Sequence, residues 1–145
     1  MKEERGITLG SLVIYVIVMI LVIVVMSSVS AMFYNNVNEL DARSTEISKF
    51  NDFNNYFVKE IKLSNNGIDT IGNDGNYILF KSGNSFSFRN NEIYYNNLKI
   101  VTGVDNMSFS YYDNQEKNKN HDIVTVSIEF EKYSKQISYK VEEIY

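Results

Sequence analysis

The chain contains no cysteine, no proline and no tryptophan, and its 145 residues include a single histidine, His121. Because there is no thiol, no disulfide framework can stabilise a small domain, and the thiolate ligands of most structural zinc sites are missing. Because there is no proline, no helix is kinked by one. The net charge of -4 and the pI near 5.0 argue against a general nucleic-acid binder, which would carry a basic face.

Charge is also missing from a long stretch near the N-terminus, where no charged residue occurs between Arg5 and Glu39. Within it, residues 12–26 are continuously apolar. The uncharged stretch is longer than the roughly 20 residues that a helix needs to cross a bilayer. Each Ile, Leu or Val favours insertion by about 0.3–0.6 kcal/mol at mid-membrane, so together they contribute several kcal/mol. The sequence therefore predicts a membrane-inserted helix over residues 7–32.

This segment differs from a cleavable secretory signal, whose apolar core has about 7–15 residues and ends at a small-residue cleavage site. Here the serines of residues 27–30 and Ala31 follow only after the full apolar run. Cleavage near Ala31 stays an alternative. Lys2 and Arg5 precede the helix, so the positive-inside rule predicts a cytoplasmic N-terminus and an extracytoplasmic C-terminal domain.

The helix is expected to continue beyond the membrane, because apolar residues keep recurring at steps of mostly three or four. They are Phe33, Val37, Leu40, Ile47, Phe50, Phe57 and Ile61. Residues 64–67 (Ser-Asn-Asn-Gly) provide a helix stop. One helix from Ile7 to about Leu63 would be roughly 85 Å long at 1.5 Å per residue. Residues 33–66 are thus interpreted as an amphipathic continuation of this stem helix that packs on a globular head.

After the helix, the periodicity changes to the two-residue alternation of β-strands. The expected strands cover residues 77–80, 86–88, 92–95, 98–101, 104–112, 123–130 and 136–142. Turn-prone Asn-Asn pairs at 90–91 and 96–97 join neighbouring strands, so the sheet should be mostly antiparallel. The polar segment 113–122 is predicted to be a loop. The predicted fold class is α+β, with a long N-terminal helix packed on a small antiparallel β-sheet head of residues 67–145.

The junction Arg5-Gly6-Ile7-Thr8-Leu9 resembles the prepilin-type signal of type IV pilins and of the pseudopilins of type II secretion and competence systems. In that family a short basic leader ends in glycine, and an apolar residue, Thr-Leu and a long apolar helix follow. A prepilin peptidase cuts after the glycine and methylates the new N-terminus. The resemblance implies a leader of residues 1–6, cleavage between Gly6 and Ile7, and N-methylation of Ile7. Glycine suits the site because it lets an extended backbone approach a protease closely.

Two positions depart from the pattern of the family. The mature chain would begin with Ile7 instead of phenylalanine, and its fifth residue would be Ser11 instead of glutamate. In the family, this carboxylate is thought to pair with the N-terminal amine of a neighbouring subunit, and Ser11 cannot form that ion pair. The small residues Gly10 and Ser11 would instead let neighbouring helices approach closely. Since some pseudopilins at filament tips also lack the glutamate, the resemblance implies a priming or tip subunit.

The order of elements after the helix is similar to a group of minor pilins. Short hairpins precede the segment at 104–113, a polar loop follows, and a Val-Thr-Val-Ser-Ile-Glu-Phe strand comes next. This looks like PilW-type pilins, the J-type pseudopilins of type II secretion and the F-type minor pseudopilin of Gram-positive competence machines. The resemblance implies a structural and assembly subunit of a type IV pilus-like filament, held in the cytoplasmic membrane and presented at the cell surface after assembly.

The partners that this resemblance implies are the prepilin peptidase, other pilins or pseudopilins through the N-terminal helix, and the inner-membrane assembly platform. It implies no catalysis, no cofactor and no small-molecule substrate. The alternative is an unprocessed, single-pass membrane-anchored domain that binds a ligand outside the cytoplasm. The leader discriminates between the two, because a plain anchor has no need of glycine directly before Ile-Thr-Leu and would keep residues 1–5.

No residue constellation supports an enzyme. His121 stands beside Asp122 in the most polar segment of the chain, a poor place for a rigid catalytic triad. A group of oxygen-bearing residues around Gly72 and Gly75 faintly resembles a calcium loop; it consists of Asp69, Asn73, Asp74 and Asn76. Its spacing fails the EF-hand pattern, so a simple turn is expected. The tyrosines could stack on single-stranded DNA, but no basic groove accompanies them. No metal site is predicted.

Overall fold

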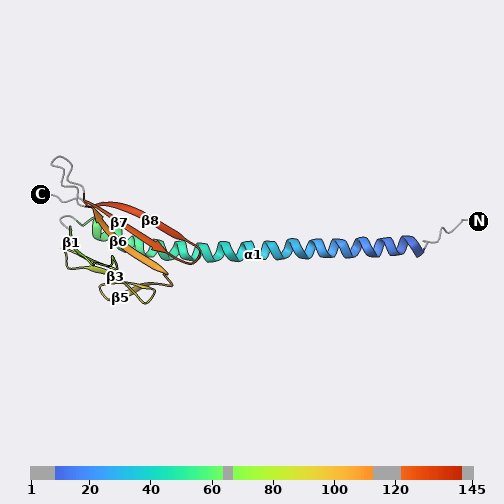
Figure 1. Cartoon of the computed structure of the whole chain (residues 1–145), viewed down its shortest axis with the longest axis horizontal. Coiled ribbons are helices and arrows are strands. Elements are labelled where there is room, and N and C mark those ends of the chain that lie inside the picture. The colour runs from blue at the N-terminus through green and yellow to red at the C-terminus, as the bar shows by residue number, and fades with distance from the viewer. Residues whose placement is uncertain (1–8, 64–66, 113–121, 142–145) are drawn as a thin grey trace, which may run out of the picture. The chain divides into compact units, whose positions relative to one another are not determined.

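The computed structural model describes residues 9–63, 67–112 and 122–141 (Figure 1). Its first element is helix α1 (Leu9–Ile61), which has 53 residues. It is uninterrupted because its sequence holds no proline, and Gly10 is its only glycine. The chain divides into two compact units, Met1–Asp41 and Ala42–Tyr145, so α1 contributes residues to both. Among the described residues of the second unit, eight strands follow the helix.

The end of α1 lies two residues before the predicted one. The amide of Lys62 donates to the carbonyl of Val58 (3.0 Å), and that of Leu63 donates to the carbonyl of Glu60 (3.2 Å). The second bond spans three residues, which is the tighter pattern typical of a helix end. The predicted stop at residues 64–66 lies outside the described residues.

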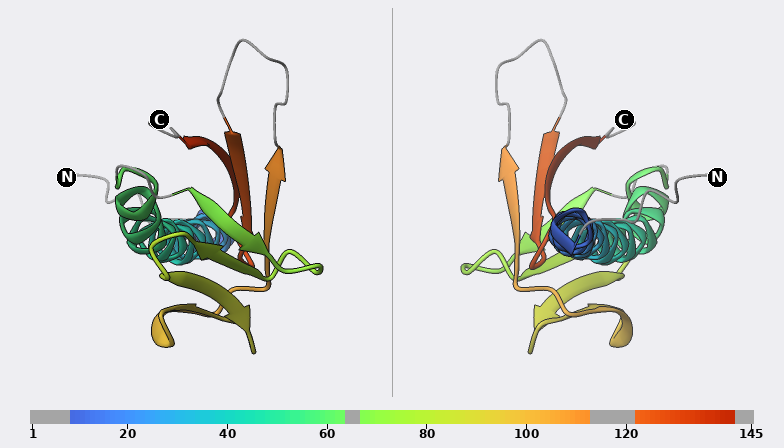
Figure 2. Two further views of the ribbon diagram at one scale, coloured as in Figure 1. Left: turned by 90° about the vertical axis from the view of Figure 1, so that its left-hand side faces the viewer. Right: turned by 90° about the vertical axis from the view of Figure 1, so that its right-hand side faces the viewer.

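Five strands form the first sheet, an antiparallel meander in the order β1-β2-β3-β4-β5 (Figure 2). They are β1 (Ile68–Ile71), β2 (Tyr77–Phe80), β3 (Ser85–Arg89), β4 (Glu92–Tyr95) and β5 (Leu98–Thr102). The last four confirm the predicted strands. Strand β1 escaped prediction because a bulge between Ile68 and Thr70 breaks the two-residue alternation.

Two asparagine pairs build the hairpins on either side of β4, as the sequence predicts. Asn90 and Asn91 have φ angles of 53° and 62°, and Asn96 and Asn97 have φ angles of 48° and 65°. Positive φ at both central residues is the type I′ geometry, which suits the twist of two-residue hairpins. Asparagine tolerates this left-handed region better than other side chains.

Residues 72–75, where the sequence faintly resembles a calcium loop, form a turn. The amide of Gly75 donates to the carbonyl of Gly72 (2.8 Å), and Gly75 has a φ of +69°. Its own carbonyl accepts from the amide of Phe109 at 2.7 Å. A Cβ at Gly75 would lie 3.0 Å from the Phe109 carbonyl oxygen, so glycine allows this close approach between the two sheets.

Three strands form the second sheet in the order β6-β7-β8 (Figure 2). They are β6 (Asn106–Tyr112), β7 (Asp122–Glu129) and β8 (Ser134–Val141), all antiparallel and in continuous register. The head thus holds two sheets where one was predicted, because the chain turns at Gly103 (φ 70°) after β5. Most of the loop predicted at 113–122 lies outside the described residues, namely 113–121. Its last residue, Asp122, belongs to β7.

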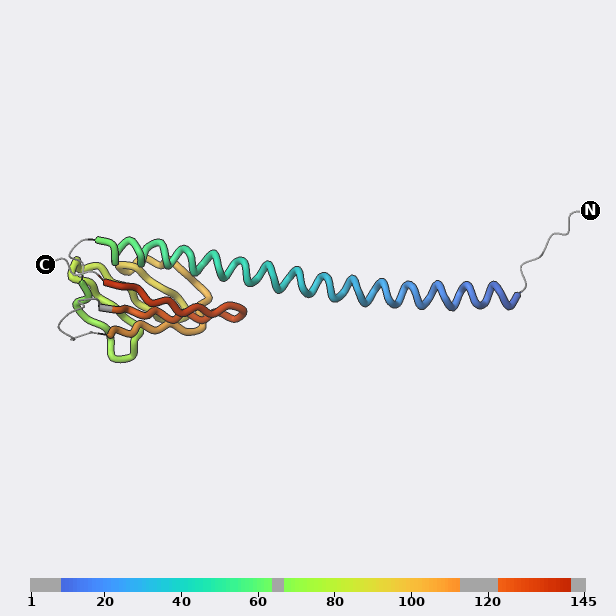
Figure 3. The backbone as a smooth tube through the Cα atoms, turned by 90° about the horizontal axis from the view of Figure 1, so that it is seen from above, coloured from blue at the N-terminus to red at the C-terminus, as the bar shows by residue number. Residues whose placement is uncertain are grey.

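The core of the head lies between the two sheets and the last turns of α1, beside which the β7–β8 hairpin runs (Figure 3). Phe57 is fully buried, and its ring contacts Phe80 and Phe86 of the first sheet and Phe109 and Tyr139 of the second, with centroids 5.1–5.8 Å apart. One aromatic side chain of the helix therefore joins both sheets.

Burial on α1 follows only part of the predicted stripe. Phe50 and Phe57 are buried, but Phe33 and Leu40, in the first unit, are each 66% exposed. The buried positions Phe50, Phe53, Phe57 and Glu60 follow steps of three and four. The buried side of the helix therefore starts at Phe50, later than the apolar pattern indicates.

Candidate assembly surface and polar clusters of the head

The apolar segment of α1 is not covered by any other part of the chain that the structure describes. Between Leu9 and Met26, large apolar side chains are exposed by fractions that run from 50% for Val13 to 81% for Leu9. The helix is long and apolar enough to span a membrane. Burying one such side chain is worth about 1.5–3 kcal/mol, so this surface is stable only in an apolar environment, either lipid or neighbouring helices.

One face of this segment carries a shallow groove without polar lining. It is lined by Val18, Leu21, Val22, Val25 and Met26. Their spacing of three, one, three and one residues places them on adjacent turns of a single helix face. Such a groove between ridges is the shape that accepts side chains of a second packed helix.

Serine hydroxyls at the end of this segment are satisfied by the helix itself. Ser27 donates to the carbonyl of Ile23 (2.8 Å), and Ser28 donates to the carbonyl of Val24 (2.9 Å). In lipid, an unpaired hydroxyl would cost free energy, and this back-bonding removes that cost. The helix surface thus stays compatible with an apolar environment as far as Ser28.

Of the four site residues predicted from the sequence, the structure describes two. Gly6 and Ile7, the predicted cleavage and methylation positions, lie outside the described residues. Gly10 and Ser11 occupy the first turn of α1, where no acidic residue occurs. A Cβ added at Gly10 would meet nothing within 4 Å. Nothing within the described chain requires glycine there, which leaves close packing by another helix as its predicted use.

Glu60 is a buried polar side chain of the head, with 2% exposure, and it joins α1 to the first sheet. Its Oε1 accepts from the hydroxyl of Tyr95 and from Nδ2 of Asn84 (3.0 Å), and its Oε2 accepts from the hydroxyl of Ser82 (3.4 Å). Burial, and then the bond to Glu60, raises the pKa of Tyr95 to about 12, so this hydroxyl stays a donor at neutral pH. The cluster fixes the β2–β3 turn to the end of the helix.

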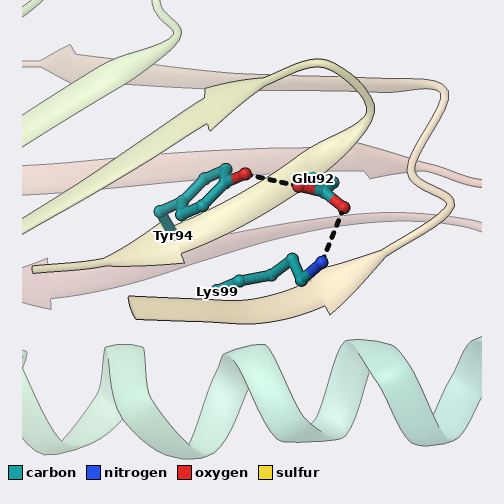
Figure 4. Close-up of polar contacts among 3 residues, drawn as sticks. All are labelled: Glu92, Tyr94 and Lys99. Atoms are coloured by element: carbon teal, nitrogen blue, oxygen red, sulfur yellow. Dashed lines mark hydrogen bonds and ion pairs between the residues drawn. The ribbon is translucent and has the colours of Figure 1, made fainter. Parts of the chain in front are cut away.

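A second polar cluster lies on β4 and β5 (Figure 4). The carboxylate of Glu92 accepts from the hydroxyl of Tyr94 and pairs with Nζ of Lys99 at 3.1 Å. The bond from Tyr94 and then that from Lys99 hold the pKa of Glu92 below its ordinary value, while the same contacts raise the pKa values of Tyr94 and Lys99. The guanidinium of Arg89 lies 4.2 Å from the centroid of the Tyr94 ring, a cation–π contact.

In both clusters a carboxylate accepts hydrogen bonds from neighbouring hydroxyl groups, and these contacts join β4 to β5 or hold the β2–β3 turn against α1. In the part of the chain that the structure describes, no three His, Cys, Asp or Glu residues gather as a metal site would require. His121 lies outside that part. Comparisons of the chain with protein-family profiles, curated proteins and solved structures gave no match.

Glu60 was not predicted as a site residue. The sequence indicates its burial only through its helical spacing, since it stands three residues after the buried Phe57 on the face that packs in the head. Its partners Ser82, Asn84 and Tyr95 are 22, 24 and 35 residues away, and no local pattern connects them to it.

Proposed function

We propose that this chain is a minor pilin or pseudopilin, a structural and assembly subunit of a type IV pilus-like filament. The observation that carries the proposal is the bare apolar segment of α1, which needs lipid before assembly and would find neighbouring helices after it. A filament core built from such helices supplies both environments in turn. The groove at Val18–Met26 would accept side chains of an adjacent subunit.

The leader supplies the second support. Arg5-Gly6-Ile7-Thr8 stands directly before α1, which begins at Leu9, as the processing signal of the resembled family does. Cleavage after Gly6 would leave Ile7 as the methylated first residue, two positions before the first residue of α1. Lys2 and Arg5 would keep the uncleaved end in the cytoplasm, where the peptidase acts, and the head would face outward.

A priming or tip position follows from Ser11. Lacking a carboxylate at this place, the subunit cannot neutralise the N-terminal amine of a neighbour, so it suits a position where that contact is not required. Partners would be other pilins or pseudopilins and the membrane assembly platform. Recovery of this chain as the bulk subunit of sheared filaments would contradict the minor role.

The test is co-expression of the full chain with a prepilin peptidase, followed by mass spectrometry of the mature N-terminus. The expected product begins at Ile7 and carries one added methyl group, whereas a catalytically inactive peptidase leaves Met1 in place. A Gly6→Val variant is the matched control and should remain uncleaved by the active enzyme. An intact Met1 with active peptidase, or a cut near Ala31, would overturn the proposal and favour the membrane-anchored binding domain.

A further inference from the structure

Strand β5 is an edge of the first sheet, because among the described strands it pairs only with β4. The hairpin of Asn96 and Asn97 closes at the pair of Tyr95 and Leu98. Along an antiparallel ladder, hydrogen-bonded pairs alternate with pairs that are not bonded. The N–H and C=O of the next residue, Lys99, therefore point away from β4. Such groups on an edge strand are a template for one further strand.

The side chains of β5 protect this edge only weakly. Natural edge strands are usually protected by charged residues, above all lysine, or by proline. The only charged residue of β5 is Lys99, and its Nζ bonds Glu92 of β4 at 3.1 Å, so it reaches back over the sheet (Figure 4). A bulge in the β4–β5 ladder adds local twist but leaves the edge uncovered. The other residues of β5 are Leu98, Ile100, Val101 and Thr102.

A groove lies between β5 and residues 52–56 of α1, and it provides walls for the side chains of an added strand. Three residues of each element line it: Asp52, Asn55, Tyr56, Leu98, Lys99 and Ile100. Tyr56 is 40% exposed and Leu98 is 62% exposed, so both walls offer apolar surface. The ring of Tyr56 lies 5.4 Å from that of Tyr95, which supports this wall from the sheet. Alternate residues of an added strand would face the groove.

Charge distinguishes between the candidate occupants of this site. Asp52 is exposed in the groove and the chain has a net charge of -4, so a strand that carries a cation is favoured. A second copy would pair through its own β5, which offers no available cation because Lys99 is bonded to Glu92. The same carboxylate disfavours nucleic acid, and lipid tails would leave the N–H and C=O of the edge unpaired.

We propose that β5 binds an extended segment of a partner protein as a sixth strand of the first sheet, with a Lys or Arg side chain of that segment directed at Asp52. Main-chain hydrogen bonds to the edge supply affinity, and the groove selects the side chains at alternate positions of the segment. The proposal rests on the head alone, so it can fail while the filament proposal holds, and the reverse is also true.

The test measures the binding of two fluorescein-labelled heptapeptides to the full chain in phosphatidylcholine nanodiscs by fluorescence anisotropy. The first is Thr-Val-Thr-Lys-Thr-Val-Thr, capped at both ends, whose even positions place Val, Lys and Val on one face of a strand. The second has Glu in place of Lys. We expect the Lys peptide to bind and the Glu peptide to bind about fivefold more weakly, as exposed charge pairs allow. Asp52→Asn should reduce this difference to less than about twofold.

Two substitutions of Lys99 separate strand addition from side-chain binding. Lys99→Pro removes the outward N–H and should abolish binding of the Lys peptide, and an edge strand tolerates proline where the N–H faces solvent. Lys99→Ala is the matched control, because it loses the same bond to Glu92 but keeps the N–H, so it should bind like the parent. A Lys peptide whose Thr and Val residues are N-methylated applies the same test without changing the protein, and it should not bind.

Circular dichroism checks that each variant keeps its fold. The proposal is overturned if the Lys peptide binds no better to the chain than to empty nanodiscs, or if the Glu peptide binds equally well. It is also overturned if the N-methylated peptide binds like the Lys peptide, or if a folded Lys99→Pro variant binds as well as Lys99→Ala.

Discussion

Replacing Phe57 with alanine should remove a large share of the stability of the head. The side chain is fully buried and contacts four rings of the two sheets in addition to the stacked ring of Phe53, 5.2 Å away. Truncating a buried phenylalanine costs about 3–5 kcal/mol, and lost aromatic pairs place this site at the upper end of that range. A domain of this size is stable by about 5–15 kcal/mol, so Phe57→Ala takes a large share of the total.

The assay is urea unfolding of the full chain in detergent micelles, followed by near-ultraviolet circular dichroism of its 11 tyrosines. Phe57→Leu keeps most of the volume and should lose roughly 1.5 kcal/mol, so it reports on the site even where the alanine variant fails to fold. The control is Phe33→Ala, which removes the same ring from a position that is 66% exposed and should change stability by less than about 0.5 kcal/mol.

The relative losses in the free energy of unfolding of these variants test whether Phe57 joins the two sheets. A loss below about 1.5 kcal/mol for Phe57→Ala, or an equal loss for Phe33→Ala, would refute the reasoning. A second unfolding transition in Phe57→Leu would have a different meaning. It would indicate that the two sheets unfold separately, and that the rings around Phe57 do not couple them.

Three further predictions concern the polar contacts. Replacing Glu60 with leucine leaves the partly buried hydroxyl of Tyr95 without its acceptor, so the free energy of unfolding should drop by about 1–3 kcal/mol in the same assay. Glu60→Gln should lose less, and equal losses for the two variants would contradict this. Asn96→Gly loses the hydrogen bonds to Ser85 N (2.8 Å) and Asn84 Oδ1 (2.7 Å), so it should destabilise the head. Asn97→Gly should be neutral or stabilising, because glycine readily adopts the φ of 65° found there. Because the folded pKa of Glu92 lies below its ordinary 4.5, its contribution is present above pH 4.5 and is lost as the pH falls through the folded pKa. The stability difference between the parent and Glu92→Gln should therefore shrink from pH 6 to pH 3, and a constant difference would exclude this contribution.

Local patterns were sufficient to predict most elements of the head. The alternation over 123–130 and the Asn-Asn pairs are readable within a few residues, and β2 to β8 lie close to their predicted positions. Division into two sheets could not be predicted, because it depends on Gly103 and on the contact between Gly75 and Phe109, which are distant in sequence. Phe53 was missed although its spacing from Phe50 and Phe57 fits the helical face.

The candidate sites divide in the same way. The apolar segment without charge can be recognised from a local stretch of the sequence alone. Its exposure on α1 agrees with the prediction of a membrane-inserted helix. The contacts of Glu60 depend instead on side chains that are distant in sequence.

The two parts of α1 obey different physical requirements within one continuous helix. From Leu9 to Met26 its large apolar side chains stay exposed among the described residues, so they require lipid or other helices. From Phe50 on, its side chains complete the core of the head, so the sheets cannot be stable without them. A soluble version of the head must therefore begin before Phe50, and Ala42, where the second unit starts, is the physically reasoned place to cut. A chain cut after Phe57 would expose Phe80, Phe86 and Phe109 and should aggregate, as uncovered apolar faces do.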